Sequence, residues 1–421
     1  MPFFSHTTPQ GAEILVEPMP HLRSCAVGFW VKRGSCHERA HEEGLAHFIE
    51  HTVFKGTEHF PTPDLMAEAT DRLGGSVDAF TGKESACFYG KVLREQLPDL
   101  VAILGDLVSS PRFDGEELAR ERGVILEEIA QSEDQPDDWV SELFYGHFWK
   151  GAPLAHPILG SREQVGGYGA AEARAFFERT YRAPNLLISA AGAIEPESFL
   201  ELLQPVLSRL PGGVGEALPA MGRPKPFLLN VSRKELQQTS LVMGFPGPHH
   251  RHADRVASNL LAHVLGGGMS SRLFMELRER RGLCYSVGSY LTHYTDTGAL
   301  QIAASCAPEN VRELVQRVIH ECNLLLMKGV SEAELERAKL QARTSLAFSQ
   351  ESSNSRMFSL AQQAIHQGGV TTLDAQIAEI DAVDLDQLHR VAKEMLDPSS
   401  LGLSALGTRK GSEIRAKDVA A

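Results

Sequence analysis

Residues 47–51 read H-F-I-E-H and combine two imidazoles and a carboxylate at a spacing that can bind a metal ion. A helix is predicted over residues 41–54, and on a helix positions i, i+3 and i+4 share one face. His47 and His51 can therefore hold one Zn²⁺, while Glu50 can lie over the open position of the metal without ligating it. The alternative is two hydrogen-bonded surface histidines on a solvated acidic helix.

This H-x-x-E-H order reverses the H-E-x-x-H motif of metallopeptidases. The chain has 17 histidines in 421 residues, and this composition predicts roughly 0.05 chance matches to the pattern per chain. A catalytic His₂ site also needs a third protein ligand and one position left open. The motif therefore predicts that a further ligand comes from elsewhere in the sequence.

The best candidate for this ligand is in a helix predicted over residues 115–132. Leu118, Ile125 and Ile129 repeat at helical spacing and mark the buried stripe of this helix. Glu128 lies next to the stripe, so its carboxylate can reach a site beneath the helix. We therefore predict Glu128 as the third ligand.

Two further glutamates of this helix have different predicted places. Glu121 lies seven residues before Glu128 and shares its face, so it can orient a ligating histidine without binding the metal itself. Glu127 points toward solvent. Taken without the pentapeptide, a solvated acidic helix remains the simpler interpretation of this segment.

The pentapeptide is followed 77 residues after His51 by Glu128, within E-R-x-V-I-x-E-E. This combination resembles the M16 (pitrilysin or insulinase) peptidases, and the length and motif style resemble the short bacterial members and the catalytic β subunit of the mitochondrial processing peptidase. The similarity continues along the chain at residues 53–57, 74–81, 155–160, 266–274 and 277–285.

The resemblance implies a site with one Zn²⁺ per chain. It assigns the metal to His47, His51 and Glu128. It gives catalytic roles to four residues: Glu50 as the base that activates water, Glu121 beside a ligand, and Arg278 and Tyr285 as donors to the developing oxyanion. For Arg278 and Tyr285 the alternatives are an ordinary surface arginine and an ordinary strand tyrosine.

Peptide binding is predicted along the segment from Val77 to Thr81. If this segment is an exposed strand edge, its unpaired N–H and C=O groups can pair with an extended peptide. Asp78, Ala79 and Phe80 are the predicted substrate-binding residues, and Asp78 stands where many family members have asparagine. A plain hairpin strand is the alternative.

A chain of 421 residues is long enough for two domains of about 200 residues each. A run rich in proline and glycine predicts a linker at residues 211–227, between a zinc-binding domain at 1–210 and a metal-free domain at 228–421. Similar segments recur in the same order in both halves, which suggests an ancient duplication.

The periodicity predicts an α+β fold with mostly antiparallel sheets. The resemblance implies two similar α+β halves that form a clamshell. Strands are expected near residues 12–17, 23–32, 85–93, 185–193, 238–245, 284–292, 297–305 and 400–406. Helices are expected near 41–54, 64–73, 96–109, 115–132, 169–180, 197–209, 253–265, 271–280, 309–327 and 331–366.

Composition narrows the possible partners and the compartment. The net charge of −13 argues against nucleic acid and anionic membranes. No apolar run reaches the roughly 20 residues of a membrane span, and no secretory signal is visible at the N-terminus. The six cysteines have no C-x-x-C pairing and are expected to be reduced thiols in a cytoplasmic protein.

Together these features predict a zinc-dependent endopeptidase that hydrolyses short or unfolded peptides in an enclosed chamber. The resemblance implies that a chain with two halves reaches this chamber as a homodimer, or as a heterodimer with a metal-free M16 subunit. The alternative function is a non-catalytic M16-like subunit that binds peptides or serves assembly. Because such subunits typically lose zinc-site residues, the complete set in this chain favours the enzyme.

Overall fold

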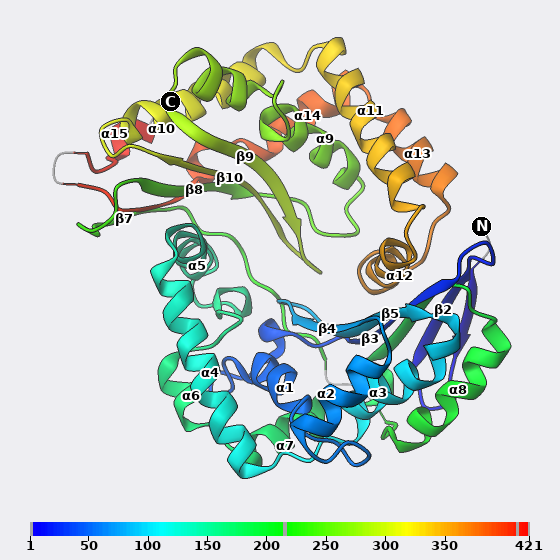
Figure 1. Cartoon of the computed structure of the whole chain (residues 1–421). Coiled ribbons are helices and arrows are strands. Elements are labelled where there is room, and N and C mark those ends of the chain that lie inside the picture. The colour runs from blue at the N-terminus through cyan, green and yellow to red at the C-terminus, as the bar shows by residue number, and fades with distance from the viewer. Residues whose placement is uncertain (1–2, 214–216, 410–411, 420–421) are drawn as a thin grey trace. The chain divides into compact units, whose positions relative to one another are not determined.

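The computed structural model describes residues 3–213, 217–409 and 412–419 (Figure 1). The chain forms two compact units, and each unit draws on three separate stretches of the sequence. Unit 1 consists of Met1–Ala130, His156–Pro219 and Phe348–Val370, and unit 2 of Gln131–Ala155, Ala220–Ala347 and Thr371–Ala421. Residues 214–216 of the predicted linker lie outside the described residues, and the division into domains at 211–227 stays a prediction.

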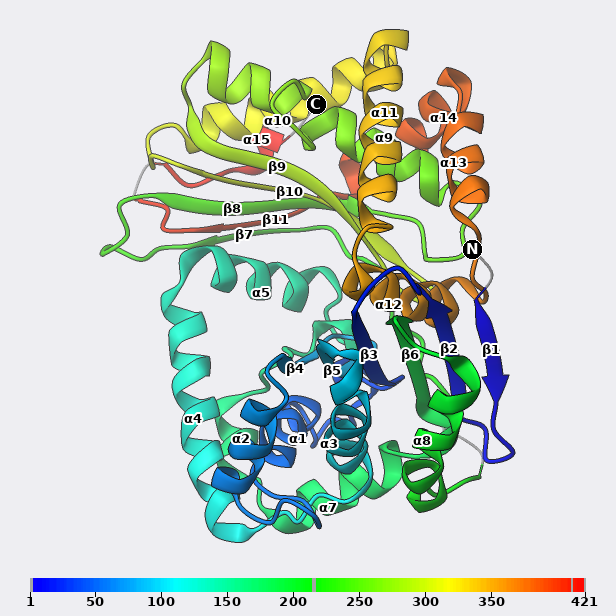
Figure 2. The ribbon, with the colours of Figure 1, turned by 45° about the vertical axis from the view of Figure 1, so that its right-hand side comes forward.

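Unit 1 contains a six-stranded mixed sheet in the order β1-β2-β6-β3-β5-β4, and Figure 2 shows β3, β6, β2 and β1 side by side. Strands β2 and β6 are parallel, and the other neighbours are antiparallel. The strands are β1 (Phe4–Thr7), β2 (Glu13–Pro18), β3 (Ser24–Val31), β4 (Ser76–Thr81), β5 (Ala86–Leu93) and β6 (Leu186–Gly192).

Helices cover both faces of this sheet. They are α1 (Leu45–Val53), α2 (Pro63–Arg72), α3 (Leu97–Ser109), α4 (Gly115–Asp134), α6 (Arg162–Gly167), α7 (Ala170–Thr180), α8 (Pro196–Arg209) and α12 (Ser353–Gln362). Alternate residues of β3 point to opposite faces of the sheet. Val27 and Phe29 enter the core that includes α1, α3, α4, α7 and α8. Ala26 and Trp30 enter a second core with α12. Both faces of the central strand β3 are therefore buried.

Unit 2 contains a five-stranded mixed sheet in the order β7-β11-β8-β10-β9. Its strands are β7 (Phe227–Val231), β8 (Thr239–Pro246), β9 (Cys284–His293), β10 (Gly298–Cys306) and β11 (Gly402–Leu406). Its helices are α5 (Pro136–Phe148), α9 (Arg255–Gly266), a π-helix (Phe274–Arg280), α10 (Val311–Lys328), α11 (Glu332–Ser349), α13 (Leu373–Ala382), α14 (Leu385–Met395) and α15 (Ala416–Val419). The last residues of α11 belong to unit 1.

The two sheets have the same plan. From β2 onward, the order and directions of the strands in unit 1 match those in unit 2, including one parallel pair in each, β2 with β6 and β7 with β11. Each sheet also packs against a helix from the other half of the sequence, α12 in unit 1 and α5 in unit 2. The predicted α+β class with two similar halves is confirmed.

Several sequence expectations differ from the structure. The predicted elements do not include strands β1 and β7 or helices α5, α6, α13, α14 and α15. The single helix predicted over 331–366 is wrong, because α11 ends at Ser349 and α12 begins after Ser352. Ser352 has extended backbone angles and its hydroxyl caps α12, which stops one helix and starts the next.

Two predictions from composition can be compared directly with the structure. The cysteines are free thiols and all of them are buried, as expected for structural residues. Within residues 3–213, 217–409 and 412–419, no helix has both the length and the apolar character needed to cross a membrane.

Helix α12 is held on unit 1 by a buried ion pair. The Arg356 guanidinium donates from Nη2 to Oε2 of Glu17 at 2.6 Å and from Nε to both carboxylate oxygens at 3.0 Å. Arg356 and Glu17 are 7% and 4% exposed. Since both charges are removed from water, loss of one partner leaves the other buried and uncompensated.

We therefore expect Arg356→Met to lower the free energy of unfolding by about 3–5 kcal/mol. Urea denaturation followed by circular dichroism measures the change. The control is Arg72→Met, which breaks an exposed ion pair with Glu68 on α2 and should cost less than about 1 kcal/mol. Equal effects of the two substitutions would contradict the prediction.

Candidate metal centre

Helix α1 carries the H-x-x-E-H residues, and a glycine turn sets its start. Gly44 has φ of 90°, a left-handed conformation that disfavours side chains. A Cβ at Gly44 would come within 2.7 Å of the Cα of Gly160. The helix therefore begins at Leu45, later than the predicted residue 41, and the close approach of the two glycines fixes its entry.

A buried carboxylate caps the same end of α1. The Glu38 side chain accepts hydrogen bonds from the backbone N–H groups of Gly44 at 2.9 Å and Ala46 at 2.8 Å. Burial raises the pKa of Glu38, and these two donors partly offset that shift. The cap satisfies donors that the first turn of a helix leaves unpaired, so it fixes the backbone just before His47.

Helices α1 and α4 bring the three predicted ligands together. Oε2 of Glu128 lies 3.7 Å from Nε2 of His47 and 3.5 Å from Nε2 of His51. One potential ligand atom from each residue lies within 4.8 Å of the others. Glu127, the neighbour of Glu128, is exposed as predicted.

The geometry of these atoms fits a divalent metal. Ligand atoms about 2.1 Å from a tetrahedral zinc lie roughly 3.4 Å apart, close to the two distances to Glu128. Oε2 of Glu128 is buried and has no hydrogen-bond donor among the described residues, although a buried oxygen normally has one. Burial lowers the pKa of His47 to about 3, so its imidazole is neutral, the form that binds a metal.

Glu50 lies beside this cluster and has a hydrogen bond of its own. The Thr81 hydroxyl on β4 donates to Oε2 of Glu50 at 2.6 Å. Burial raises the pKa of Glu50, and the Thr81 hydrogen bond acts in the opposite direction. A carboxylate in such surroundings can accept a proton and return it.

Glu121 contacts His51 from the other side of the imidazole ring. Its Oε2 lies 3.3 Å from Nδ1 of His51, and its Oε1 lies 3.0 Å from Nζ of Lys55. If Nδ1 carries the proton donated to Glu121, Nε2 presents its lone pair toward Glu128 and the metal position. Glu121 thus contacts a histidine of the pentapeptide, and its role beside a metal ligand stays a prediction.

The predicted substrate-binding residues lie on β4. This strand is at the end of the sheet and pairs with β5 alone among the described strands. Asp78 is exposed and accepts a hydrogen bond from the Tyr89 hydroxyl at 3.1 Å. Ala79 and Phe80 pack into the unit 1 cores with their side chains, so the edge presents backbone groups.

Arg278 and Tyr285 belong to unit 2 and contact each other there. The Arg278 guanidinium lies 4.8 Å from the ring centre of Tyr285 and 4.8 Å from that of Phe274. Stacking between two rings holds a guanidinium in place while leaving its N–H groups able to donate. Tyr285 is 79% exposed.

Sequence reasoning missed two contacts of the site. Thr81 was predicted only as part of the peptide-binding edge, but it contacts Glu50, and Lys55 had no predicted role, but it contacts Glu121. A partial signal was present for Lys55, because it follows His51 by four residues and can lie on the same side as its imidazole. Thr81 had no such signal, because its contact joins residues 31 positions apart on different elements.

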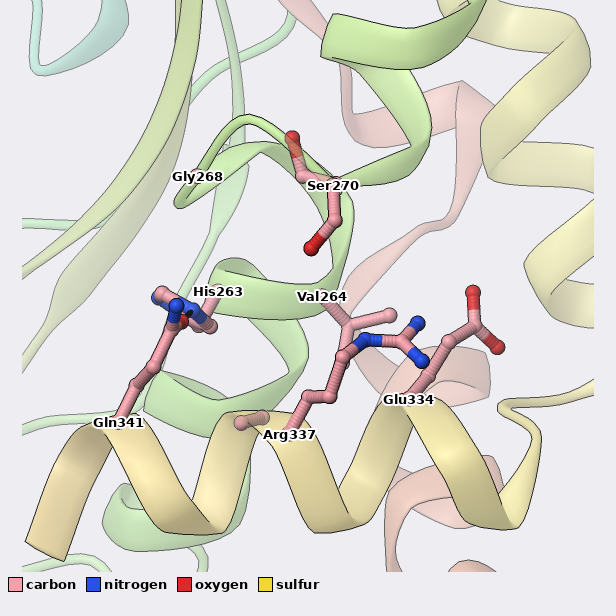
Figure 3. Close-up of a pocket in the computed structure, with 9 residues that line it drawn as sticks. His263, Val264, Gly268, Ser270, Glu334, Arg337 and Gln341 are labelled. Carbon is pink, nitrogen blue, oxygen red and sulfur yellow. Dashed lines mark hydrogen bonds between the residues drawn. The ribbon is translucent and has the colours of Figure 1, made fainter.

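Two hollows in unit 2 offer little as binding sites. The one in Figure 3 lies between Gly268, Ser270 and α11 and has a volume of about 20 Å³, about enough for one water molecule. The other lies beside α5 and has a volume of about 370 Å³. It is open, and its Asp137 carboxylate already accepts a hydrogen bond from Ser305 at 3.0 Å.

Comparison with protein families identifies the class of the chain. The family model described as Insulinase (Peptidase family M16) matches residues 13–162. A second model, described as Peptidase M16 inactive domain, matches residues 169–342. The metal cluster therefore lies entirely within the first match.

Similar proteins extend this result to most of the chain. An uncharacterized zinc protease of Bacillus subtilis is 35% identical over 93% of this chain and 95% of its own length. One of Mycobacterium tuberculosis is 34% identical over 95% of this chain and 92% of its own length. One from Rickettsia felis is 38% identical over 81% of this chain and 82% of its own length. The chain belongs to the M16 peptidase family, and the names of its relatives support a zinc protease.

Solved structures confirm the fold. A protease from Helicobacter pylori has a TM-score of 0.90 at 21% identity, with coverage of 96% of this chain and 99% of that one. A Pseudomonas fluorescens protein described as a peptidase M16 inactive domain also has a TM-score of 0.90 at 21% identity, with coverage of 97% and 98%.

The adjacent glutamates of α4 give a sharp test of the metal cluster. We expect Glu128→Gln to weaken zinc binding by more than about 100-fold, because loss of even an outer-shell partner costs about 10–100-fold. Glu127→Gln removes the same charge from the exposed side of the helix and should bind zinc like the wild type. Competition with a chromogenic chelator measures both affinities. Equal zinc affinity in the two variants would contradict the assignment of Glu128.

Proposed function

We propose that this chain is a zinc-dependent endopeptidase that hydrolyses short or unfolded peptides. The observation that carries the proposal is the buried, undonated oxygen of Glu128 close to Nε2 of both His47 and His51. A zinc ion held by these three residues would supply the Lewis acidity that activates water near neutral pH. Membership of the M16 family and the names of the relatives support the same activity.

The chain's own residues have separate tasks in this proposal. Glu50 accepts a proton from the attacking water and later donates it to the leaving amine. Glu121 accepts the Nδ1 hydrogen of His51 and fixes the orientation of the imidazole. The backbone of β4 pairs with the extended substrate, which selects peptides that can adopt a strand.

Arg278 and Tyr285 remain proposed as donors that stabilise the oxyanion. This role rests on the resemblance to the family's arginine and tyrosine pair. Their mutual stacking in unit 2 supports it, because a guanidinium and a phenol held in place can donate hydrogen bonds with little rearrangement.

The decisive experiment compares the wild type with Glu50→Gln on a library of quenched fluorescent peptides. We expect both proteins to contain the same amount of zinc, because Glu50 does not bind the metal in this proposal. Turnover should fall by about 10²–10⁴-fold, the usual contribution of general acid–base catalysis. Elemental analysis gives the zinc content.

The other outcomes would each reject part of the proposal. Zinc in both proteins without turnover in either would indicate a missing partner subunit or the non-catalytic M16-like subunit that binds peptides or serves assembly, and addition of a metal-free M16 subunit distinguishes the two. Absence of zinc from the wild type after purification in zinc-containing buffer would reject the metal centre.

We also propose that the active form contains two M16 chains, since the resemblance implies partnership for chains with two halves. Light scattering of the purified protein is expected to give twice the mass of 46.0 kDa if the chain pairs with itself. A monomer that gains activity only on addition of a metal-free M16 subunit would indicate a heterodimer. A fully active monomer would contradict the proposal.

A further inference from the structure

Strand β4 is joined to the proposed base by one short hydrogen bond. The hydroxyl of Thr81, the last residue of the strand, donates to Oε2 of Glu50 at 2.6 Å. Bonds from a neutral hydroxyl to a carboxylate are among the stronger hydrogen bonds in proteins. This bond engages Oε2, one of the two carboxylate oxygens of Glu50.

The direction of the Thr81 side chain follows from the alternation of β4. Val77 and Ala79 pack against the core on the α1 side of the sheet. Phe80 points to the opposite face and packs against the core of α12. Because successive side chains of a strand alternate between faces, Thr81 points to the same side as Ala79, toward α1.

Aromatic packing holds this end of β4 in place. The ring centre of Phe80 lies 5.7 Å from that of Trp30, 6.2 Å from that of Tyr89 and 6.0 Å from that of Phe358 on α12. Contacts between aromatic rings at such distances stabilise a structure beyond the contribution of their buried area. The cluster therefore resists sliding or rotation of the strand next to Thr81.

Backbone hydrogen bonds fix the same point from the other side. Thr81 is paired with Ala86 of β5, and the N–H of Gly82 donates to the Ser85 carbonyl at 2.8 Å to close the hairpin. The N–H of Ser35 donates to the Gly82 carbonyl at 3.1 Å. The position of the Thr81 hydroxyl is thus set by the sheet and by the segment after β3, in addition to the packing of β4 against α1.

We propose that Thr81 is a positioning residue for Glu50, so that one strand aligns both the base and the substrate. This inference rests on the proposed peptidase function. A peptide paired with the open edge of β4 takes its register from the same backbone that holds the Thr81 hydroxyl. Because the Thr81 hydroxyl and the open edge belong to one strand, β4 sets the position of the Glu50 carboxylate relative to a paired peptide.

The test replaces the hydroxyl while keeping the shape of the side chain. Thr81→Val is expected to lower kcat by about 10- to 100-fold, since a misplacement of about 1 Å can cost about 10²-fold. Zinc content and KM should change little. Thr81→Ser keeps the donor and should restore most of kcat. The control is Thr70→Val on α2, which removes a hydroxyl that donates to the Met66 carbonyl of the same helix at 2.9 Å and should behave like the wild type.

A double-mutant cycle shows whether Thr81 acts through Glu50. In the Glu50→Gln background, Thr81→Val should lower the residual kcat by less than about twofold, because the group that it orients is already absent. An equal loss in both backgrounds would overturn the proposal, as would a wild-type kcat in Thr81→Val alone.

Two further results distinguish failure of this inference from failure of the proposed function and from misfolding of a variant. If wild type itself does not hydrolyse peptides, the proposed function fails before Thr81 is tested. If Thr81→Val does not fold, Thr81→Ala enters the same cycle, and failure of Thr81→Ser to retain activity would also overturn the role of the hydroxyl.

Discussion

The carboxylates of Glu50, Glu121 and Glu128 converge on His51, and their mutual repulsion is the constraint around which unit 1 is arranged. All three influence the pKa of His51: burial lowers it, but the hydrogen bond that Glu121 accepts and the charges of Glu128 and Glu50 raise it overall. Charges of one sign gathered in a partly buried site are costly unless cations or hydrogen-bond donors compensate them. A bound divalent cation would be the strongest compensating charge available to the site.

Glu121 and Glu50 have different compensating partners, and this separates their chemistry. Glu121 has the ammonium of Lys55 in addition to His51, and its pKa is lowered because these hydrogen bonds outweigh burial. Glu50 has the neutral hydroxyl of Thr81, and burial leaves its pKa raised. A residue kept ionised suits the task of orienting an imidazole, whereas one that can gain a proton suits acid–base work. The surroundings of each side chain thus favour one role over the other.

Local spacing was enough to predict the centre of this site. The pentapeptide lies on one turn of a helix, and Glu128 was found from its place beside the stripe of Leu118, Ile125 and Ile129, which are buried. Most strands were found from short apolar runs bounded by turns. These signals all come from residues close together in one helix or strand, where the repeat of the backbone sets the direction of each side chain.

What sequence reasoning missed depends on contacts between distant segments. Helix α12 was predicted as the continuation of α11, yet it packs on the sheet of unit 1 through Arg356 and Glu17, which are 339 positions apart. Thr81 reaches Glu50 only because β4 folds back beside α1. Such pairings are settled by tertiary packing, and the serines after Ser349 give only a weak local sign that the helix stops there.

The two sheets share one plan, but the potential metal ligands of unit 1 depend on only a few residues of that plan. In unit 2, α9 follows β8 as α1 follows β3 in unit 1. His263 on α9 is followed by Val264, Leu265 and Gly266, and its imidazole is hydrogen-bonded to Gln341. The same strand and helix arrangement thus carries a cluster of potential metal ligands in unit 1 and an apolar run in unit 2. Fold similarity alone therefore does not transfer activity between the halves. The difference comes from a few side chains on one helix, together with the strand and the second helix that hold them in place.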